Sequence, residues 1–300
     1  MTASSPRVTI VTGCSSGIGR ATAVEMHRAG LTVYATSRQK EDLANLAGLG
    51  IHTMPLDVTD EASIAAAVER VEAEQGRIDV LVNNAGIRVI GSIEEASPET
   101  VRRQFETNVL GLVRLTQLVL PGMRAQGGGM IVNVSSIFGR LAPPGGGYPA
   151  ATKHAVTAIS DALRLEVAPF GIRVVLIEPS GTRTKLIKNA LQRELTADGP
   201  YAQFNRDVVR WNVMATSGPP YNFAGRFAPG PEKAARVITR AVTSGKPHSR
   251  YAIGPVVPLL FMLKRLLPGA AFDRIIRSQF PVPRPAAAPG QAVADKAAVG

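Results

Sequence analysis

The stretch from Thr12 to Gly19 decides the fold, and it reads TGCSSGIG. It follows a short apolar run, Val8–Val11, and opens a segment long enough for a helix. Gly13 permits a tight turn after the strand, while Gly17 and Gly19 let the backbone approach a pyrophosphate at the positive end of the helix. Glycines placed in this way between a strand and a helix predict a dinucleotide-binding site, whereas the same residues elsewhere would say little.

Short apolar runs alternate with helix-length segments along most of the chain. The first six runs are continuously apolar, which is typical of parallel strands covered on both faces. This alternation predicts an α/β fold, a Rossmann-type doubly wound parallel sheet of about seven strands in a single domain. The expected strands are Val8–Val11, Leu31–Ala35, Ile51–Asp57, Ile78–Asn83, Met130–Ser135, Ile172–Glu178 and Tyr251–Gly254.

Two of the intervening helices carry clear signals. One is predicted over residues 60–75, with Thr59 or Asp60 as its N-cap and Gly76 at its end. The other is predicted over residues 149–167, where apolar side chains recur at helical spacing.

Several segments of the chain depart from this alternation of strands and helices. We expect one Rossmann-type domain over residues 1–254, in which residues 185–230 form a lid over the substrate cleft; a plain surface excursion is the alternative. Trp211 either lines that cleft or anchors the lid. Residues 255–280 predict an apolar and basic helical extension, and the Pro/Ala/Gly-rich residues 281–300 predict a disordered tail.

The composition argues against several classes of function. The net charge of +11 comes from dispersed arginines, without a basic block or a zinc-ligand spacing, so we expect neither a nucleic-acid partner nor a metal. Cys14 is the single cysteine, which fits a reducing, cytoplasmic compartment. No apolar run approaches the ~20 residues of a membrane helix, so we expect no transmembrane segment. For the C-terminal helices, packing on protein is preferred over peripheral membrane contact.

With its particular spacing, the glycine motif resembles that of the short-chain dehydrogenase/reductase family. Further marks of that family follow in order, and together they cover roughly residues 7–184. The resemblance implies an oxidoreductase that interconverts an alcohol and a carbonyl on a fairly hydrophobic small molecule, similar to steroid and retinol dehydrogenases, and it implies a homo-oligomer. The marks are Asp57-Val58 after the third strand, Asn83–Gly86 after the fourth, Asn108, Val134–Ser136 and Pro179–Thr182.

The end of the second strand bears on the choice of cofactor. NAD-binding proteins typically place an acidic residue about 20 positions after the glycines, where it bonds the ribose 2′-hydroxyl. Here Ser37 and Arg38 stand in that region, and a guanidinium matches the geometry of a 2′-phosphate. We therefore expect NADP(H) rather than NAD(H); the alternative is that Arg38 stacks on the adenine without selecting a phosphate.

The resemblance also implies the cofactor contacts. Asp57 should contact the adenine amino group with Val58 beside the ring, and the segment Asn84–Gly86 should pass under the adenosine ribose. The whole implied set is Gly13, Ser15, Ser16, Gly17, Ile18, Gly19, Ser37, Arg38, Asp57, Val58, Asn84, Ala85, Gly86, Lys153, Pro179, Gly181, Thr182 and Thr184.

The resemblance implies four catalytic residues. Tyr148 is the general acid/base, and the ammonium of Lys153 lowers the pKa of the phenol and binds the nicotinamide ribose. Ser136 holds the substrate oxygen, and Asn108 helps to hold a proton-relay water. In the reductive direction hydride reaches the carbonyl carbon while the phenol delivers the proton.

One spacing departs from the family's pattern. The family places its tyrosine four residues before the lysine, and here Pro149 stands at that position with Tyr148 before it. On a helix, residues four apart differ by about 40° and residues five apart by about 140°. A residue before proline is pushed toward an extended conformation, so Tyr148 is expected just outside the helix, with Pro149 as the first helical residue.

Three interpretations of this spacing stay open. Tyr148 acts as the acid from a shifted position; or the site binds NADPH but barely turns over, leaving a binding or regulatory protein; or Tyr148 is a packing aromatic and another group or water supplies the proton. The first is preferred because Asn108, Ser136 and Lys153 are otherwise intact.

Overall fold

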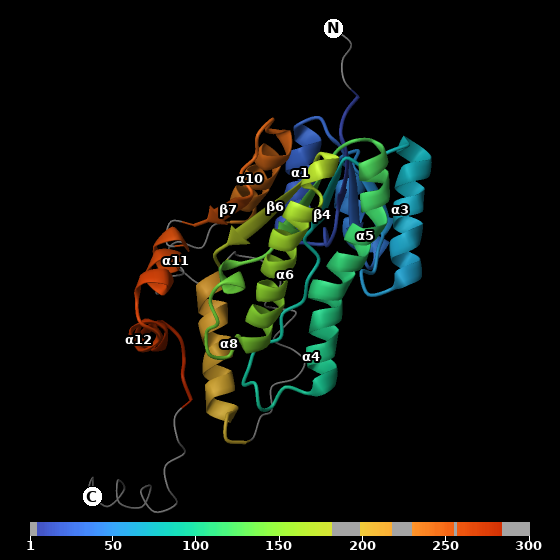
Figure 1. The fold of residues 1–300 in the computed structure, drawn as a ribbon. Helices are drawn as coiled ribbons and strands as arrows, with labels where there is room; N and C mark the ends of the chain where they lie inside the picture. The colour runs from blue at the N-terminus through green and yellow to red at the C-terminus, as the bar shows by residue number, and fades with distance from the viewer. Residues whose placement is uncertain (1–4, 182–198, 218–229, 255–256, 284–300) are drawn as a thin grey trace, which may run out of the picture.

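A seven-stranded sheet forms the centre of the protein (Figure 1). The computed structural model describes residues 5–181, 199–217, 230–254 and 257–283. Every paired strand in the sheet is parallel, and the order β3-β2-β1-β4-β5-β6-β7 confirms the predicted doubly wound sheet. Each observed strand begins and ends within two residues of its predicted limits: β1 Val8–Val11, β2 Thr32–Ser37, β3 His52–Pro55, β4 Val80–Asn83, β5 Gly129–Val134, β6 Ile172–Pro179 and β7 Arg250–Ile253.

Helices cover both faces of the sheet (Figure 1). On one face α1 (Gly17–Arg28) packs against α10 (Pro231–Thr243), and the short α2 (Ala44–Ala47) lies beyond them. On the other face lie α3 (Glu61–Gln75), α5 (Gly111–Ala125) and α6 (Gly147–Glu166). Because both faces are covered, successive strand residues are buried alternately in the two layers.

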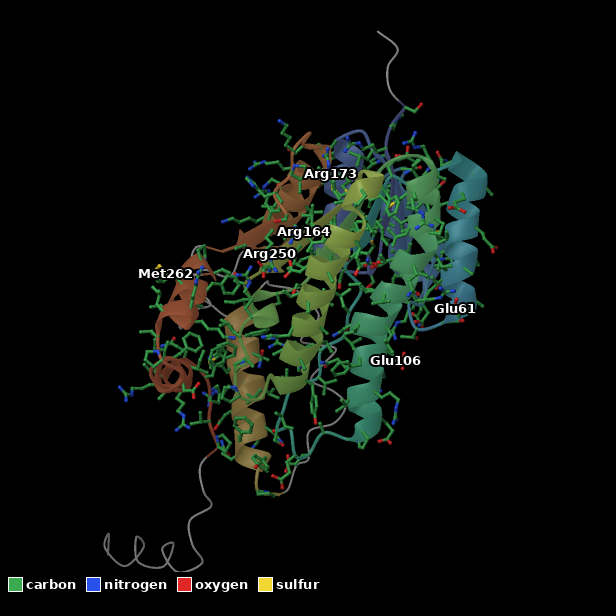
Figure 2. The ribbon with its side chains drawn as sticks, in the orientation of Figure 1. Glu61, Glu106, Arg164, Arg173, Arg250 and Met262 are labelled. Atoms are coloured by element: carbon green, nitrogen blue, oxygen red, sulfur yellow. The ribbon has the colours of Figure 1, made fainter. Side chains whose placement is uncertain are left out.

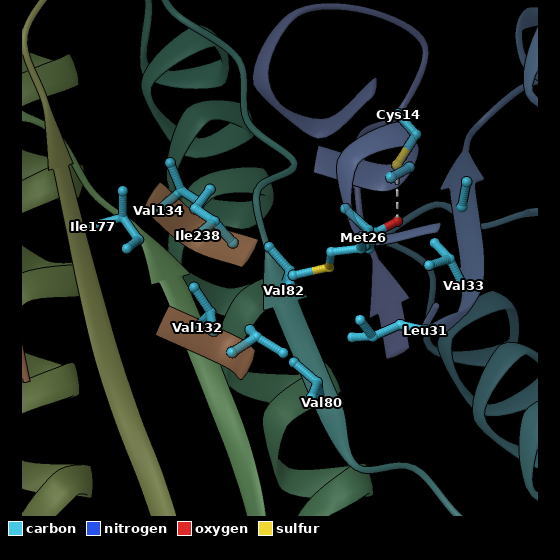
Figure 3. Close-up of a cluster of buried hydrophobic side chains, with 14 of the residues drawn as sticks. Cys14, Met26, Leu31, Val33, Val80, Val82, Val132, Val134, Ile177 and Ile238 are labelled. Carbon is cyan, nitrogen blue, oxygen red and sulfur yellow. Dashed lines mark hydrogen bonds between the residues drawn. The ribbon is translucent and has the colours of Figure 1, made fainter. Parts of the chain in front are cut away.

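The larger core cluster lies between the sheet and the layer of α1 and α10 (Figure 3). Met26 of α1 extends there toward Val82 of β4, and Val132 of β5 belongs to the same cluster. Cys14 belongs to the same cluster: it is 0% exposed, and its thiol donates to the Val11 carbonyl at 3.2 Å. Burial raises the pKa of Cys14 to about 12, so this residue fills space as an inert thiol.

The start and stop signals of α3 are confirmed. The Asp60 carboxylate accepts a bond from the Ala62 amide at 3.0 Å, so Asp60 rather than Thr59 is the N-cap. Gly76 ends the helix with φ 71°, a left-handed conformation that glycine adopts without strain.

The expected start of α6 is wrong. The helix begins at Gly147, two residues before Pro149, so Tyr148 is helical and not extended. The physical reason is that the first-turn amides of a helix have no intrahelical partner, so proline removes no bond at the third helical position. The chain then continues regularly, with the Ala150 amide donating to the Gly146 carbonyl at 2.9 Å.

A buried carboxylate joins the last two strands. Glu178 on β6 is 1% exposed and accepts bonds from Arg140 at 2.7 Å and from Arg250 at 3.2 Å. Arg250 also pairs with Asp161 of α6, close to Arg164 (Figure 2). Breaking a buried charge pair by removing one partner is costly, so this group fixes β7 beside β6.

Additional helices surround the carboxyl ends of the strands. They are α4 (Pro98–Phe105), a π-helical turn (Glu106–Leu110), α8 (Ala202–Ser217), α11 (Val257–Leu266) and α12 (Gly269–Gln279). The residues predicted as a lid, 185–230, lie partly outside the described residues, and α8 is the described helix within them. The pair α11 and α12 falls in the segment expected to be helical, with Met262 exposed on α11 (Figure 2). Among the described helices none has the length and apolarity to cross a bilayer.

Candidate active site

The loop between β1 and α1 forms a close-fitting cradle. A Cβ at Gly13 would lie 2.8 Å from the Ala85 Cα, and one at Gly19 would lie 2.4 Å from the Gly13 carbonyl oxygen. Gly17 has φ 59°, which disfavours any side chain. Ser16 precedes α1 without capping it through its side chain, so the first-turn amides are available to an anion. The cradle therefore fits the pyrophosphate of a dinucleotide.

Thr12, the first residue of the glycine motif but not one of the predicted cofactor contacts, joins this cradle to the loop after β4. Its hydroxyl oxygen accepts bonds from the Asn84 and Ala85 amides, both at 2.9 Å. The Asn84 side chain in turn donates to the carbonyls of Thr12 at 2.8 Å and Gly13 at 3.2 Å. Asn84 thus holds the phosphate loop in shape, a role that the motif alone did not indicate.

The residues predicted to contact the adenosine lie at the ends of β2 and β3. Ser37 is buried at the end of β2 and its hydroxyl donates to the Gln39 carbonyl, whereas Arg38 is exposed. Asp57 accepts bonds from the amide and hydroxyl of Thr59, at 2.9 and 2.7 Å. Val58 is buried against Gly111, where a Cβ would lie 2.3 Å from the Val58 carbonyl oxygen.

The end of β6 borders the nicotinamide side of the predicted site. Pro179 is buried and is the last residue of the strand, and the Ser180 amide bonds the Ile253 carbonyl at 2.9 Å. Gly181 is exposed. The predicted cofactor residues Thr182 and Thr184 lie outside the described residues.

Asn108 sits in the π-helical turn between α4 and α5. Its side-chain oxygen accepts from the Ile87 amide at 2.8 Å, and its nitrogen donates to the Ile87 carbonyl at 2.9 Å and to the Thr152 hydroxyl at 3.2 Å. A π-turn widens a helix locally and often marks a functional position. Thr152, also absent from the predicted set, connects Asn108 to α6 directly before Lys153.

Two adjacent serines follow β5 and have different surroundings, as expected from the alternation of a strand. Ser135 is 3% exposed and donates to the Lys153 carbonyl at 3.1 Å. Ser136 is half-buried, and its hydroxyl oxygen accepts from the Phe138 amide at 3.2 Å. A Cβ at Gly139 would lie 2.5 Å from the Ser135 hydroxyl, so this glycine allows α6 to approach β5 closely.

Lys153 is half-buried on α6, and its ammonium donates to the Val134 carbonyl at 2.7 Å. Burial disfavours the charged amine and lowers the pKa of Lys153 to about 8. The bond to Val134 brings the ammonium to the carboxyl end of β5, within two residues of Ser136 in sequence. Lysine and serine therefore lie at the same edge of the sheet.

Tyr148 points elsewhere. Its hydroxyl donates to the Ile93 carbonyl at 3.3 Å, in an exposed position on the loop before α4. Pro149, four residues before Lys153, is buried. Since Tyr148 and Lys153 both belong to α6 and are five residues apart, they project from the helix about 140° apart. The structure thus brings together the regions of Asn108, Ser136 and Lys153, and it directs Tyr148 to Ile93.

A parallel sheet with a glycine cradle after its first strand, and with polar side chains at its carboxyl edge, is typical of dinucleotide-binding α/β proteins. Comparison with known proteins identifies the family. Residues 7–195 match the short chain dehydrogenase family, and the chain belongs to that family. It is therefore an NAD(P)-dependent oxidoreductase.

Individual relatives resemble almost the whole chain. A 3-ketodihydrosphingosine reductase from Bacteroides thetaiotaomicron is 37% identical over 257 residues, covering 85% of this chain and 91% of its own. An NADPH-dependent 3-dehydrocapnine reductase from Ornithobacterium rhinotracheale is 32% identical, covering 90% and 95%. The crystal structure of a short-chain dehydrogenase from Streptomyces avermitilis is 34% identical with a TM-score of 0.72, covering 92% and 99%.

Proposed function

We propose that this oxidoreductase uses NADP(H) to interconvert an alcohol and a carbonyl on a fairly hydrophobic small molecule. The observation that supports the proposal is a pair of hydrogen bonds: Asn108 bonds Thr152, the residue before Lys153, and the Lys153 ammonium bonds the carbonyl of Val134, two residues before Ser136.

When bound, the nicotinamide ring supplies hydride to the carbonyl carbon or takes it back. The Ser136 hydroxyl, which in this structure donates to the Pro179 carbonyl at 3.5 Å, is assigned to donate to the substrate oxygen as negative charge grows there. The Lys153 ammonium binds the nicotinamide ribose and, with a pKa of about 8, stays predominantly charged at neutral pH. Asn108 fixes the Ile87 backbone and supports the water through which a proton is exchanged with solvent.

We assign the role of proton donor to Tyr148. This requires the phenol to leave the Ile93 carbonyl and turn toward the substrate oxygen. The loop before α6 favours such a movement, because Gly145 and Gly146 precede the helix and Gly145 has φ 71°. The bond that must break is long, at 3.3 Å, and exposed to water, which replaces it at little cost.

The preference for NADP(H) rests on the end of β2. Arg38 is exposed there beside Ser37, with no acidic residue in the strand from Thr32 to Ser37. An arginine in this place suits a 2′-phosphate, and one relative is named as NADPH-dependent. If Arg38 selects the phosphate, Arg38→Ala should raise the Kd for NADPH on the order of tenfold or more while changing that for NADH little. Equal weakening of both would contradict the assignment.

A hydrophobic substrate fits the apolar surroundings of the site. Ile90 on the loop after β4 packs with Phe204 and Val208 of α8, and the two relatives named above are reductases of 3-ketodihydrosphingosine and 3-dehydrocapnine. We propose a carbonyl or alcohol carried on an apolar chain or ring.

A second candidate function is favoured by the bond between Tyr148 and Ile93. If the phenol stays there, the site holds NADPH but lacks a direct proton donor, and the protein acts mainly through cofactor-dependent binding. Nicotinamide fluorescence separates the two functions. Both predict a change in NADPH emission on binding, but only the first predicts NADPH consumption when carbonyl compounds of increasing chain length are added. NADPH binding without consumption across such a series, and without NADP+ reduction by the alcohols, would refute the reductase.

A further inference from the structure

Arg88 is a cation near the site to which the proposed reaction gives no role. It is half-buried on the loop after β4, and its guanidinium carbon lies 5.3 Å from the centre of the Phe138 ring. Its Nε atom is buried without a hydrogen-bond partner, and no carboxylate in the described segments of the chain forms an ion pair with it.

The backbone on both sides of Arg88 is held firmly. Asn108 bonds both the amide and the carbonyl of Ile87, and the Val89 amide donates to the Gln104 side chain at 2.7 Å. The Gln104 residue is itself 0% exposed. Arg88 is therefore presented from a fixed stretch of chain, and its side chain is not on a freely moving loop.

The Arg88 side chain lines a hollow between the loop before α6, α8 and the end of α12. The free volume inside the hollow is about 10 Å³, roughly the space of one water molecule, so a substrate group can reach the guanidinium only from the open side of the hollow. The lining is otherwise largely apolar and includes Val208, Trp211 and Phe280.

A half-buried cation without a carboxylate partner is unfavourable unless something compensates for it. Desolvation lowers the pKa of Arg88 to about 10, which leaves the guanidinium charged at neutral pH. The Phe138 ring offers a cation–π contact, which offsets only part of the lost hydration. An anion at the open side of the hollow would regain the remainder through charge-assisted hydrogen bonds to the guanidinium.

The hollow adjoins the catalytic groups through two short connections. The Phe138 amide bonds the Ser136 hydroxyl at 3.2 Å, and Arg88 lies over the Phe138 ring. On the other side, Ile87 next to Arg88 is bonded by Asn108. A substrate whose carbonyl reaches Ser136 can thus extend a neighbouring group toward Arg88.

We infer that Arg88 binds an anionic group of the substrate, so that the preferred substrates are carbonyl compounds or alcohols bearing a carboxylate, sulfonate or phosphate beside an apolar portion. The guanidinium pairs with the anion, while Trp211 and Phe280, whose rings are 4.5 Å apart, pack against the adjoining carbon chain. This inference rests on the proposed function, because it names the substrate class of the same site.

The test compares matched probes that differ only in charge. Levulinate and methyl levulinate have the same reacting ketone, and acetonylsulfonate extends the comparison to a sulfonate. The ratio of kcat/KM for the acid to that for the ester is measured with NADPH for the wild type, Arg88→Met and Arg102→Met. Arg102 is exposed on α4, so its variant makes the same change of net charge away from the hollow. Calorimetric titration of levulinate into the enzyme with NADP+, where no reduction can follow, gives binding without turnover.

We expect the wild type to prefer levulinate on the order of 10- to 100-fold, as a charge-assisted hydrogen bond allows. Arg88→Met should reduce this ratio to nearly one, and Arg102→Met should retain it. An equal ratio in the wild type and Arg88→Met, or no acid preference in the wild type, overturns the inference. If Arg88→Met does not fold, Arg88→Gln replaces it, and calorimetry on that variant decides.

The failures of the two proposals are distinguishable. If levulinate binds in an Arg88-dependent manner but neither probe is reduced, the inference stands and the reductase fails. If methyl levulinate and levulinate are reduced equally well by every variant, the reductase stands and the anionic substrate class fails. Acetonylsulfonate shows whether the anion must be a carboxylate: equal Arg88-dependent preference supports recognition of charge in general.

Discussion

Replacing Pro149 by tyrosine tests the source of the proton most directly. Position 149 lies four residues before Lys153 on α6, so side chains at these positions project only about 40° apart, against about 140° for Tyr148. A well-placed general acid contributes roughly 10²- to 10⁴-fold to a rate. We therefore expect Pro149→Tyr to raise the rate constant of the chemical step in ketone reduction about 10²-fold, with the Kd for NADPH little changed.

The structure also fixes the cost of this replacement. Pro149 is in the first turn, where its missing amide leaves no bond to restore, and Thr152 bonds the backbone carbonyl of residue 149 at 2.9 Å, which any residue supplies. The side chain is buried, however, so a larger ring should lower the free energy of unfolding by roughly 1–3 kcal/mol. Urea titration measures that loss.

The assay is NADPH oxidation in single-turnover conditions, which isolates the chemical step from product release. Pro149→Phe is the matched control, because it introduces the same ring without the hydroxyl. Pro149→Tyr should be faster than both the wild type and Pro149→Phe. If it folds and binds NADPH yet reacts no faster than Pro149→Phe, the account of the displaced tyrosine is wrong.

Three further outcomes test other parts of the site. Tyr148→Phe should lower ketone reduction about 10²-fold while NADPH affinity is retained, and an unchanged rate would assign the proton to another group. Gly19→Ala should weaken NADPH binding and destabilise the fold by roughly 1–3 kcal/mol, because its Cβ would lie 2.4 Å from the Gly13 carbonyl oxygen. Fluorescence titration and thermal unfolding measure the two effects. Gly48→Ala is the control, because its Cβ would make only ordinary contacts. Burial lowers the pKa of Lys153 from 10.5 to about 8, so the folded chain binds fewer protons than the unfolded chain between those pH values. The free energy of unfolding should consequently rise with pH across that window by up to about 3 kcal/mol from this residue, and urea titrations of Lys153→Met should lack that part of the rise.

The fold was largely predictable because its signals are local. Short apolar runs located each of the described strands to within two residues, and the chemistry of Asp60 and Gly76 explains why α3 begins and ends where it does. The glycine motif was informative for the same reason. Gly13 and Gly17 have positive φ, and Gly19 closely approaches the nearby Gly13 carbonyl.

Parts of the site were not predictable because they depend on contacts between distant segments. The Thr12 hydroxyl bonds a loop 72 residues away, and Thr152 meets Asn108 across 44 residues. Tyr148 was misplaced because its preference for an extended conformation before proline was outweighed by the start of a long helix. Arg88 gave no signal in the sequence, since only the assembled structure reveals that its Nε is buried without a partner.

The hydrogen bonds from the Asn84 and Ala85 amides to the Thr12 hydroxyl have a consequence for the order in which ligands bind. Thr12 and Asn84 fasten the phosphate cradle to the chain that continues, four residues later, into Arg88. Binding of the dinucleotide to the phosphate cradle should therefore rigidify the segment from Asn84 to Arg88, which borders the substrate in the proposed reaction. We expect compulsory sequential kinetics, in which the nucleotide enters first and leaves last.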